Sequence, residues 1–368
     1  MPSAPPVERA GRRTDRRGRD AAVRAPYPIS DRALPFLIGG LLAGLVLATS
    51  VAIAIGTVAV PLADVFAVTW AHLTPGNSEQ NLLYDQIVWD FRTPRVLLSA
   101  VSGAGLSVAG VCLQALVRNP LADPYLLGVS SGASLGAVVA LTTVTALTTT
   151  VGVSGAAFLG ALATVVVVLG LAQRSGRVSA TRLILAGVAV AYLGSALTSY
   201  VQLQADPTEL RGTMFWLLGS VAGASWTDLP APTVALVACA LWLATQGRRL
   251  NALTMGEDSA TGLGIDVNRL RIGLLLVASL LTATVVSVAG GIGFVGLMVP
   301  HAVRLLVGPD HRRVVPVSLL LGALFLVLVD LLSRTLDRPN EMPIGIFTAV
   351  LGAPFFLWLM RRRAGALR

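Results

Sequence analysis

The sequence predicts an all-α polytopic membrane protein of about ten transmembrane helices. Of its 368 residues, 54% are hydrophobic and 13% are charged, and the mean hydropathy is +0.75, whereas a soluble domain carries about 25% charged residues. Ten largely uncharged apolar segments have roughly the length that a helix needs to cross a bilayer, the eighth being short. They lie at about 35–60, 96–116, 125–146, 154–172, 183–203, 229–246, 272–292, 293–307, 315–336 and 343–360.

The basic residues predict the orientation of these helices. All 28 of the Lys and Arg residues are Arg. With the N-terminus inside, all but five of them fall in the N-terminal tail or at inner loops and helix ends, as the positive-inside rule requires, so both termini are expected in the cytoplasm. The net charge of +9 is therefore topological and does not indicate nucleic-acid binding. The five outer arginines are Arg92, Arg95, Arg211, Arg334 and Arg338.

The chain divides into a tail and one membrane domain. Residues 1–33 are rich in Arg, Pro and Gly, and we expect a disordered cytoplasmic tail there. The apolar run that follows is too long for the h-region of a signal peptide, so it is interpreted as a retained first span of a domain over 34–368. Cys112 and Cys239 both lie within spans, which favours small core residues and predicts neither a disulfide framework nor a metal site.

Residue types that are absent or rare in the sequence limit the possible transport mechanisms. A phosphate-binding P-loop needs a lysine, and the sequence contains none. Ionisable groups in the spans are confined to helix ends (Asp330 and Arg334, His301 and Arg304), whereas proton-driven carriers usually bury such groups at mid-membrane. These absences predict a transport passage that is powered by a partner. A secondary carrier driven by an ion gradient is the alternative.

One five-residue stretch matches the consensus of a catalytic motif. Gly128-Val129-Ser130-Ser131-Gly132 fits G-x-S-x-G, which in hydrolases needs a strand-turn-helix context and a nearby His and acid. Here the motif opens a membrane helix, where small residues let neighbouring helices approach closely. The packing interpretation is favoured, and an intramembrane serine hydrolase using Ser130 or Ser131 is the alternative.

Two breaks in the apolar pattern predict inner features. Pro120 and Pro124 forbid a continuous helix, so residues 118–124 are expected to form a tight inner turn before a closely packed Gly/Ser-rich helix. The tetrapeptide Ser-Val-Ala-Gly occurs at 107–110 and again at 287–290, each with a proline ten residues after the glycine. An odd number of helices separates the copies, which suggests two inverted five-helix halves.

The longest inner loop, 247–271, carries helix signals. Glu257 and Asp258 favour the start of a short helix, Gly262 and Gly264 its end, and Asp266 the cap of a second short helix. Two short helices at a corner would project as a stiff knob into the cytoplasm, and a docking element is one interpretation of it.

These segments together resemble the permease subunits of ABC importers for iron-siderophores, haem and cobalamin, the FecCD type. The resemblance covers about residues 35–362 and rests on the stretches 92–136, 183–197, 255–267, 290–316 and 341–359. It implies a transport permease of a bacterial cytoplasmic membrane, not an enzyme, that binds no cofactor itself. The implied ligand is an iron-siderophore, with haem or cobalamin as alternatives.

The resemblance also implies partners and their contact residues. The permease is expected to form a dimer with a second copy or a paralogue, to bind two ATPase subunits that use ATP and Mg, and to receive ligand from an extracytoplasmic substrate-binding lipoprotein. Acidic residues of that lipoprotein would meet Arg92, Arg95 and Arg334 through ion pairs that are individually weak but orient docking; anchoring to lipid headgroups is the alternative. The ATPase-coupling pattern G-E-x-x-A-x-x-L-G is matched by Gly256, Glu257, Ala260, Leu263 and Gly264.

The same resemblance implies a cytoplasmic gate and a lining for the pathway. The gate would comprise Asn119 and Leu121 in the loop after the second span and Ala180 and Thr181 before the fifth. A hydroxyl is common in relatives at the position of Ala180, so the chemistry of the gate differs there. Side chains of the fifth span are expected to line the pathway: Val188, Ala191, Tyr192, Ser195 and Ser199.

Overall fold

The computed structural model describes residues 29–30, 32–56, 58–74, 81–142, 149–174, 176–338 and 340–365. Most of the predicted tail lies outside these residues and stays a prediction. Helices dominate the described part, with one two-stranded antiparallel pairing, β1 (Gln173–Arg174) with β2 (Arg177–Val178). The prediction of an all-α polytopic protein is therefore confirmed, apart from this short turn between two helices.

Each of the ten predicted spans coincides with a helix. These are α2 (Leu34–Ala54), α5 (Thr93–Val117), α6 (Val129–Thr142), α7 (Thr150–Ala172), α8 (Ala180–Gln204), α10 (Pro230–Thr254), α12 (Val267–Ala289), α13 (Val295–Val307), α14 (His311–Ser333) and α15 (Ile344–Gly365). In the described residues, seven helical stretches are long and apolar enough to cross a membrane, whereas α6, α13 and the apolar part of α15 are shorter.

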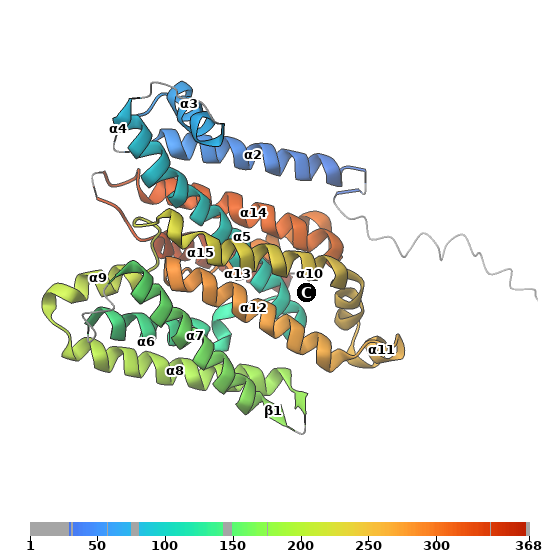
Figure 1. Cartoon of the computed structure of the whole chain (residues 1–368). Helices are drawn as coiled ribbons and strands as arrows, with labels where there is room; N and C mark the ends of the chain where they lie inside the picture. Colours follow the sequence, from blue (N-terminus) through green and yellow to red (C-terminus); the bar gives the residue numbers. More distant parts are fainter. Residues whose placement is uncertain are drawn as a thin grey trace, which may run out of the picture.

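The remaining elements lie at the two ends of the bundle, as Figure 1 shows. One end carries α3 and α4, and we name it the α3 end; the opposite end carries α11, and we name it the α11 end. The elements at the α3 end are α3 (Leu62–Leu73), α4 (Leu82–Asp85), the π-helix η2 (Gln86–Arg92), α9 (Pro207–Leu217) and η5 (Trp226–Asp228). Towards the α11 end lie η3 (Pro124–Leu127), β1, β2 and α11 (Glu257–Gly262).

Helix α5 is the centre of the bundle. Nearly all of its residues are buried, against α10, α12, α13 and α14. Small residues make this packing close: a β-carbon added at Gly103 would overlap the carbonyl of Gly322 in α14, and one at Gly110 would overlap that of Gly296 in α13. Such backbone approach, which only glycine permits, is the usual way in which membrane helices associate.

The Gly/Ser-rich segment after the inner turn also packs closely, as predicted. A β-carbon at Gly132 of α6 would overlap the carbonyl of Gly160 in α7, and one at Gly187 of α8 would overlap the carbonyl of Leu126. The hydroxyl of Ser131 donates to the carbonyl of Gly128 at 2.8 Å. These contacts explain the small residues of the G-x-S-x-G match by packing.

The repeated tetrapeptide has different places in its two helices. Residues 107–110 lie within α5, whereas 287–290 end α12, where Gly290 has φ +69°. Helices α5 and α12 pack together, and the last residue before the inner turn, Arg118, is linked through Glu257 to the start of α12 at Arg271. The two helices therefore run in opposite directions, as predicted, although the four matching letters do not mark equivalent turns.

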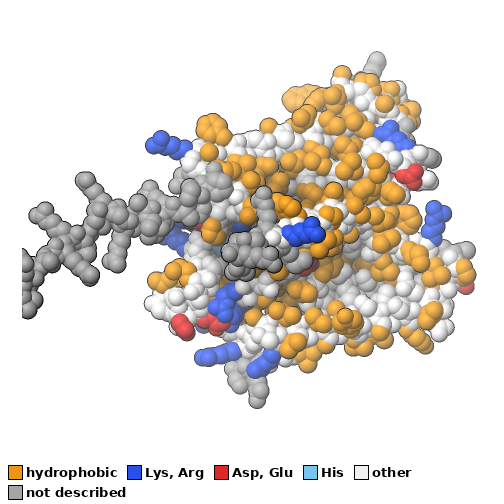
Figure 2. Space-filling model, turned by 180° about the vertical axis from the view of Figure 1, so that it is seen from behind, with side chains coloured by type: hydrophobic (Ala, Val, Ile, Leu, Met, Phe, Trp, Pro, Cys, Tyr) orange, Lys and Arg blue, Asp and Glu red, His pale blue; other side chains and the backbone are white. Residues whose placement is uncertain are grey.

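Hydrophobic side chains cover the broad middle of the surface in Figure 2, and the charged side chains visible there lie mainly towards the two ends. Exposed Phe, Leu and Trp side chains are numerous on the described helices, among them Phe36, Leu171 and Leu241. A lipid bilayer is the solvent that such a surface needs.

Candidate functional site

At the α3 end, Arg92 ties two elements together. It is the last residue of η2, and its guanidinium donates to the carbonyls of Ile53 at 2.8 Å and Ala54 at 2.9 Å, and also to that of Val58. The last carbonyls of a helix have no partner within the helix. Arg92 therefore satisfies the end of α2 and fixes it to the start of α5.

Arg95 and Arg334 converge on Asp330 of α14. Arg95 Nε donates to Asp330 Oδ1 at 2.9 Å, and its Nη1 reaches both carboxylate oxygens of Glu341, at 2.9 and 3.0 Å. Arg334 Nε lies 3.5 Å from Asp330 Oδ2, and its Nη2 donates to the carbonyl of Ala52. One carboxylate thus holds the guanidiniums of two separate helical segments.

Three of the five outer arginines, those predicted to dock the binding protein, line one cleft of about 340 Å³ together with Glu341. The structure brings them together but does not expose them: Arg92, Arg95 and Arg334 are 7%, 8% and 5% accessible to solvent. Because each side chain is bonded inside the chain, reversing the charge at any of these positions would disturb the fold as well as any docking. Their docking role stays a prediction.

At the α11 end, the predicted loop 247–271 is shorter than expected. Helix α10 continues to Thr254 and α12 already begins at Val267, so only residues 255–266 project. Arg248 and Arg249 belong to the last turns of α10, since charged residues are tolerated where a span leaves the bilayer. Asp266 Oδ1 accepts from the Arg269 backbone N–H at 3.0 Å, but the helix that it caps is the long span α12 and not a second short helix.

The projecting segment has the geometry of a rigid corner. Gly256 (φ +122°) and Gly264 (φ +77°) flank α11 with backbone conformations that other residues rarely adopt. Ala260 is fully buried, which anchors α11 on the bundle, whereas Leu263 is 68% exposed. The five predicted coupling residues therefore lie together, with one apolar side chain presented to the outside.

Glu257, the first residue of α11, joins the corner to the core of the bundle. Its Oε1 accepts from Arg271 Nη2 of α12 at 2.6 Å and from Arg118 Nη2 at 3.2 Å. The hydrogen bond from Arg271 is the main reason that the pKa of Glu257 lies below its usual value, with the charges of Arg271 and Arg118 acting in the same direction. Arg118 has φ +55° and ends α5 directly before Asn119.

The loop after α5 is tightly bonded. Asn119 Oδ1 accepts from the Leu121 backbone N–H at 2.9 Å, and Gln114 Nε2 donates to the carbonyls of Ala122 at 3.2 Å and Gly296 at 3.1 Å. Asp123 Oδ1 accepts from the Tyr125 backbone N–H at 2.9 Å, and burial raises the pKa of Asp123 to about 6. The predicted turn is thus confirmed as an ordered structure.

The second predicted gate segment begins α8. Ala180 and Thr181 follow β2, and this turn is held to α12 because Asn268 accepts from the Val178 backbone N–H at 3.1 Å and donates to the Gly176 carbonyl at 3.0 Å. Within the described residues, no hydrogen bond or ion pair joins this segment to Asn119 or Leu121. The gate therefore stays a prediction.

The predicted pathway residues mark a face of α8 that the chain itself leaves largely uncovered. Tyr192, Ser195 and Ser199 are exposed, and Val188 and Ala191 are half-buried. Lipid tails offer no hydrogen bond to hydroxyl groups on the open face of a membrane helix, so these groups bond to carbonyls of their own helix, to water or to another polypeptide.

Sequence reasoning missed the partners of the charged residues. Asp330 was noted only as a charge near a helix end, and neither its bond to Arg95 nor the role of Glu341 was foreseen. The sequence does carry a hint of these ion pairs, because Asp330 and Glu341 lie close along the chain to the outer arginines Arg334 and Arg338. The link of Glu257 to Arg118 and Arg271 was missed in the same way.

The fold and the charged residues at its two ends define a class of protein: a polytopic helical membrane protein with a rigid corner, α11, that projects from one end. Comparison with known proteins identifies the family, because residues 44–362 match the FecCD transport family. The chain belongs to this family. It is the permease subunit of an ABC importer, a non-catalytic role that dismisses the serine-hydrolase alternative and implies ATPase and binding-protein partners.

Curated relatives differ in their named ligands. The chain is 43% identical over 277 residues to the cobalamin import permease BtuC of Halobacterium salinarum, covering 75% of this chain and 74% of the relative. It is 39% identical to the hemin transport permease HmuU of Yersinia pestis, covering 88% and 96%, and 37% identical to the Fe(3+) dicitrate permease FecD of Escherichia coli, covering 75% and 85%.

A solved structure supports the fold. An inward-facing transporter that has been assigned to the metal-chelate type of ABC transporters superposes with a TM-score of 0.77 at 32% identity, covering 89% of this chain and 99% of that one. The helical arrangement described above is thus shared with that transporter.

Proposed function

We propose that this permease takes a large metal chelate into the cytoplasm, with an iron-siderophore complex as the first candidate and haem or cobalamin as the alternatives. The described face of α8 supports a large ligand that is held weakly: its exposed side chains include Tyr192, Ser195, Ser199 and Tyr200, and none of these is charged. The relatives that are named for cobalamin, hemin and iron dicitrate support a metal chelate as the ligand.

Uptake by cells with and without the gene tests the ligand. Labelled ferric siderophore, haem and cobalamin are offered separately, and only the first should accumulate in a gene-dependent manner. Gene-dependent uptake of haem or cobalamin alone would replace the siderophore by that ligand. Uptake of none of the three would contradict the proposed size class.

The α11 corner is proposed as the seat of the ATPase, with the α11 end and both termini in the cytoplasm. The observation that carries this proposal is the exposed Leu263 on a corner whose base is fixed by Ala260 and by the ion pairs of Glu257. Because Arg118 directly precedes Asn119, a displacement of α11 would reach the proposed gate through one ion pair. Cysteine introduced at Leu263 should react with a membrane-impermeant maleimide only in inside-out vesicles; reaction in right-side-out cells would contradict the orientation.

The arginine cleft at the α3 end is proposed as the docking site of the binding protein. All three guanidiniums are engaged within the chain, but Glu341 is 39% exposed and is the partner that an incoming carboxylate could replace. Glu341→Gln frees one nitrogen of Arg95 for that carboxylate, so the affinity for the binding protein should rise. The control Arg211→Gln removes an outer charge outside the cleft, and equal affinities in both variants and the wild type would contradict the docking role.

The second copy of the permease, or a paralogue, is proposed to cover the open face of α8. The exposed hydroxyls of Ser195 and Ser199 support this arrangement, because they would then face the water-filled passage between two copies. Cysteine replacing Ser195 should cross-link copies of the chain in the membrane. Cysteine replacing Phe36 on α2, an exposed position on another helix, serves as the control and should not cross-link.

A further inference from the structure

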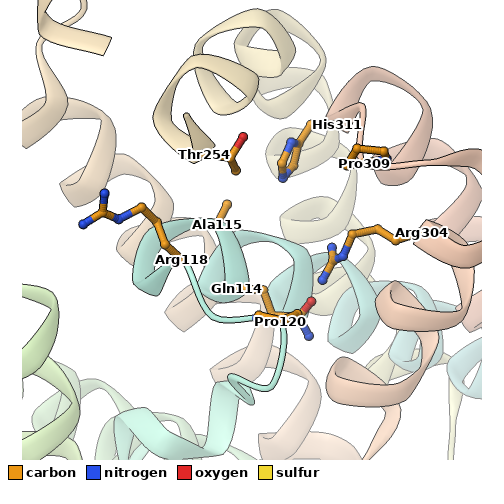
Figure 3. A pocket seen from close by; sticks show the side chains of 8 residues that line it. All are labelled: Gln114, Ala115, Arg118, Pro120, Thr254, Arg304, Pro309 and His311. Atoms are coloured by element: carbon orange, nitrogen blue, oxygen red, sulfur yellow. The ribbon is translucent and has the colours of Figure 1, made fainter. Parts of the chain in front are cut away.

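A cavity at the α11 end has no assigned occupant. Its volume is about 180 Å³, and it lies where α5, α10 and α13 end and α14 begins. Figure 3 shows the side chains that line it, among which Gln114, Arg118, Pro120, Thr254, Arg304 and His311 matter here. The volume corresponds to about six water molecules at roughly 30 Å³ each, which is room for one small anionic group.

Arg304 is the feature that demands an explanation. It lies in the last turn of α13, is half-buried, and directs its guanidinium into the cavity in Figure 3. No hydrogen bond or ion pair to its guanidinium exists within the described residues, and no Asp or Glu lines the cavity. Arg118 turns its guanidinium away, towards Glu257. A partly buried cation without a counter-charge is unfavourable, so the cavity is built for an anion.

His311 supplies a second polar group, and its orientation is fixed. Asn251 Oδ1 accepts from both the backbone N–H and the ring Nδ1 of His311, each at 2.9 Å. Asn251 Nδ2 in turn donates to Asp310 Oδ1 at 2.7 Å, which identifies Oδ1 as the acceptor side of the amide. The ring proton therefore sits on Nδ1, and Nε2 is left as a hydrogen-bond acceptor that a hydroxyl group of a ligand could satisfy.

The position of the cavity indicates the source of the anion. The residues that follow Arg304, Leu305 and Leu306, are 50% and 41% exposed, so the guanidinium lies where an apolar helix leaves the hydrocarbon of the bilayer. Basic pockets between membrane helices at this depth hold lipid headgroups, and guanidinium geometry matches phosphate oxygens. Gln114 Oε1 is a buried acceptor without a hydrogen bond, which a headgroup hydroxyl could satisfy.

We propose that this cavity binds the headgroup of an anionic phospholipid, with Arg304 as the ligand of its phosphate and with His311 Nε2 and Gln114 Oε1 as acceptors for its hydroxyl groups. The site does not depend on the import function. It joins the ends of four helices next to α11 and next to the loop that begins at Arg118, so an occupied site would brace both segments.

Thermal unfolding of the purified, delipidated full-length chain tests the proposal. Short-chain phosphatidylglycerol should raise the midpoint of the wild type, whereas the matching diacylglycerol, which lacks phosphate, should not. Arg304→Gln should require about tenfold more phosphatidylglycerol for the same shift, the size expected when a charge-assisted contact is lost. Arg248→Gln, which removes an exposed arginine of the same end outside the cavity, should behave as the wild type.

Without lipid, Arg304→Gln should unfold at or above the midpoint of the wild type, because Arg304 makes no internal bond that the variant could lose. An equal Arg304-dependent shift with inorganic phosphate would assign the same site to free phosphate. Identical phosphatidylglycerol titrations of wild type and Arg304→Gln would overturn the proposal and leave the cavity to water. Arg304→Lys, which keeps the charge, gives a second comparison and should retain part of the response.

Discussion

The two ends of this permease hold arginines and carboxylates in opposite surroundings. At the α3 end, the side chain of Asp330 is fully buried and those of Arg95 and Arg334 nearly so. At the α11 end, the side chains of Glu257 and Arg118 are 44% and 42% exposed. Water screens the second pair and not the first, so the first fixes helices permanently whereas the second can be broken cheaply.

This difference bears on how an importer is driven. A segment that moves between two states needs contacts that take little free energy to break. The exposed ion pair between Glu257 of α11 and Arg118 is such a contact. A segment that must keep its shape while partners come and go needs contacts that are expensive to break. The buried arginine cluster therefore suits a fixed platform, and the Glu257 junction suits a moving link.

The largest effect is expected from Asp330→Ala, which removes the one carboxylate that Arg95 and Arg334 share and leaves Arg334 without any. Breaking a buried ion pair by removing one partner costs about 3–5 kcal/mol, so the amount of folded protein in the membrane and its thermal midpoint should both fall strongly. Asp337→Ala, which removes an exposed carboxylate of the same end, is the control. Equal loss in both variants would show that burial does not distinguish the two ends.

A smaller effect is expected from Gly264→Val. A side chain at φ +77° costs about 1–3 kcal/mol of local strain, which should deform the corner and reduce transport per ATP hydrolysed in the reconstituted importer. Gly262→Ala places a methyl group in open space within helical α11 and should leave the ratio unchanged. Transport at the level of the wild type in Gly264→Val would argue against a rigid corner.

Arg118→Gln should change coupling more than stability. The exposed pair with Glu257 is worth about 0.2–1 kcal/mol, so the thermal midpoint should stay within error, while transport per ATP falls about two- to fivefold.

In Arg271→Gln the stronger, less exposed bond at 2.6 Å is lost, and the midpoint should drop measurably. The double variant Arg118→Gln with Glu257→Gln measures the pair itself; additive losses of coupling would mean that the two residues act independently.

The smallest expected effect is the pH dependence of the stability that Glu257 gives to the α11 corner. Since the folded pKa of Glu257 is lowered, its ion pairs stabilise the corner at all pH values above the unfolded pKa and are lost as the pH falls through the folded value. The thermal midpoint should therefore not change through this group near neutrality and should lose this contribution only in acid, below the ordinary carboxyl value of 4.5. Glu257→Gln should remove this acid-dependent component, and its persistence would assign the response to another group.

The helices could be predicted because the length and hydrophobicity of each apolar run indicate a membrane helix, whichever helices pack against it. The start of α11 at Glu257 and the cap at Asp266 were equally local and equally predictable. The partners of the charged side chains were not, since Arg95 meets Asp330 across 235 residues and Arg118 meets Glu257 across 139. Such pairs depend on which helices lie side by side, a property that no single segment encodes.

The same limit explains the outer arginines. Their position at one end followed from the charge bias, but their burial depends on how α2, α5 and α14 pack, and Arg92 bonds to the end of α2 through carbonyls that every residue has. The length of the projecting corner was overestimated because polar residues such as Arg248 are as compatible with an exposed last helical turn as with a loop.

The central claim is that this permease does not hydrolyse ATP itself and that a separate ATPase, bound at α11, drives transport. Accumulation of labelled ferric siderophore in sealed liposomes tests it directly, with the permease alone under a proton or sodium gradient, and with the ATPase and binding protein plus ATP. The account predicts uptake only in the second case and no ATP turnover by the permease alone. Uptake by the permease alone would contradict it.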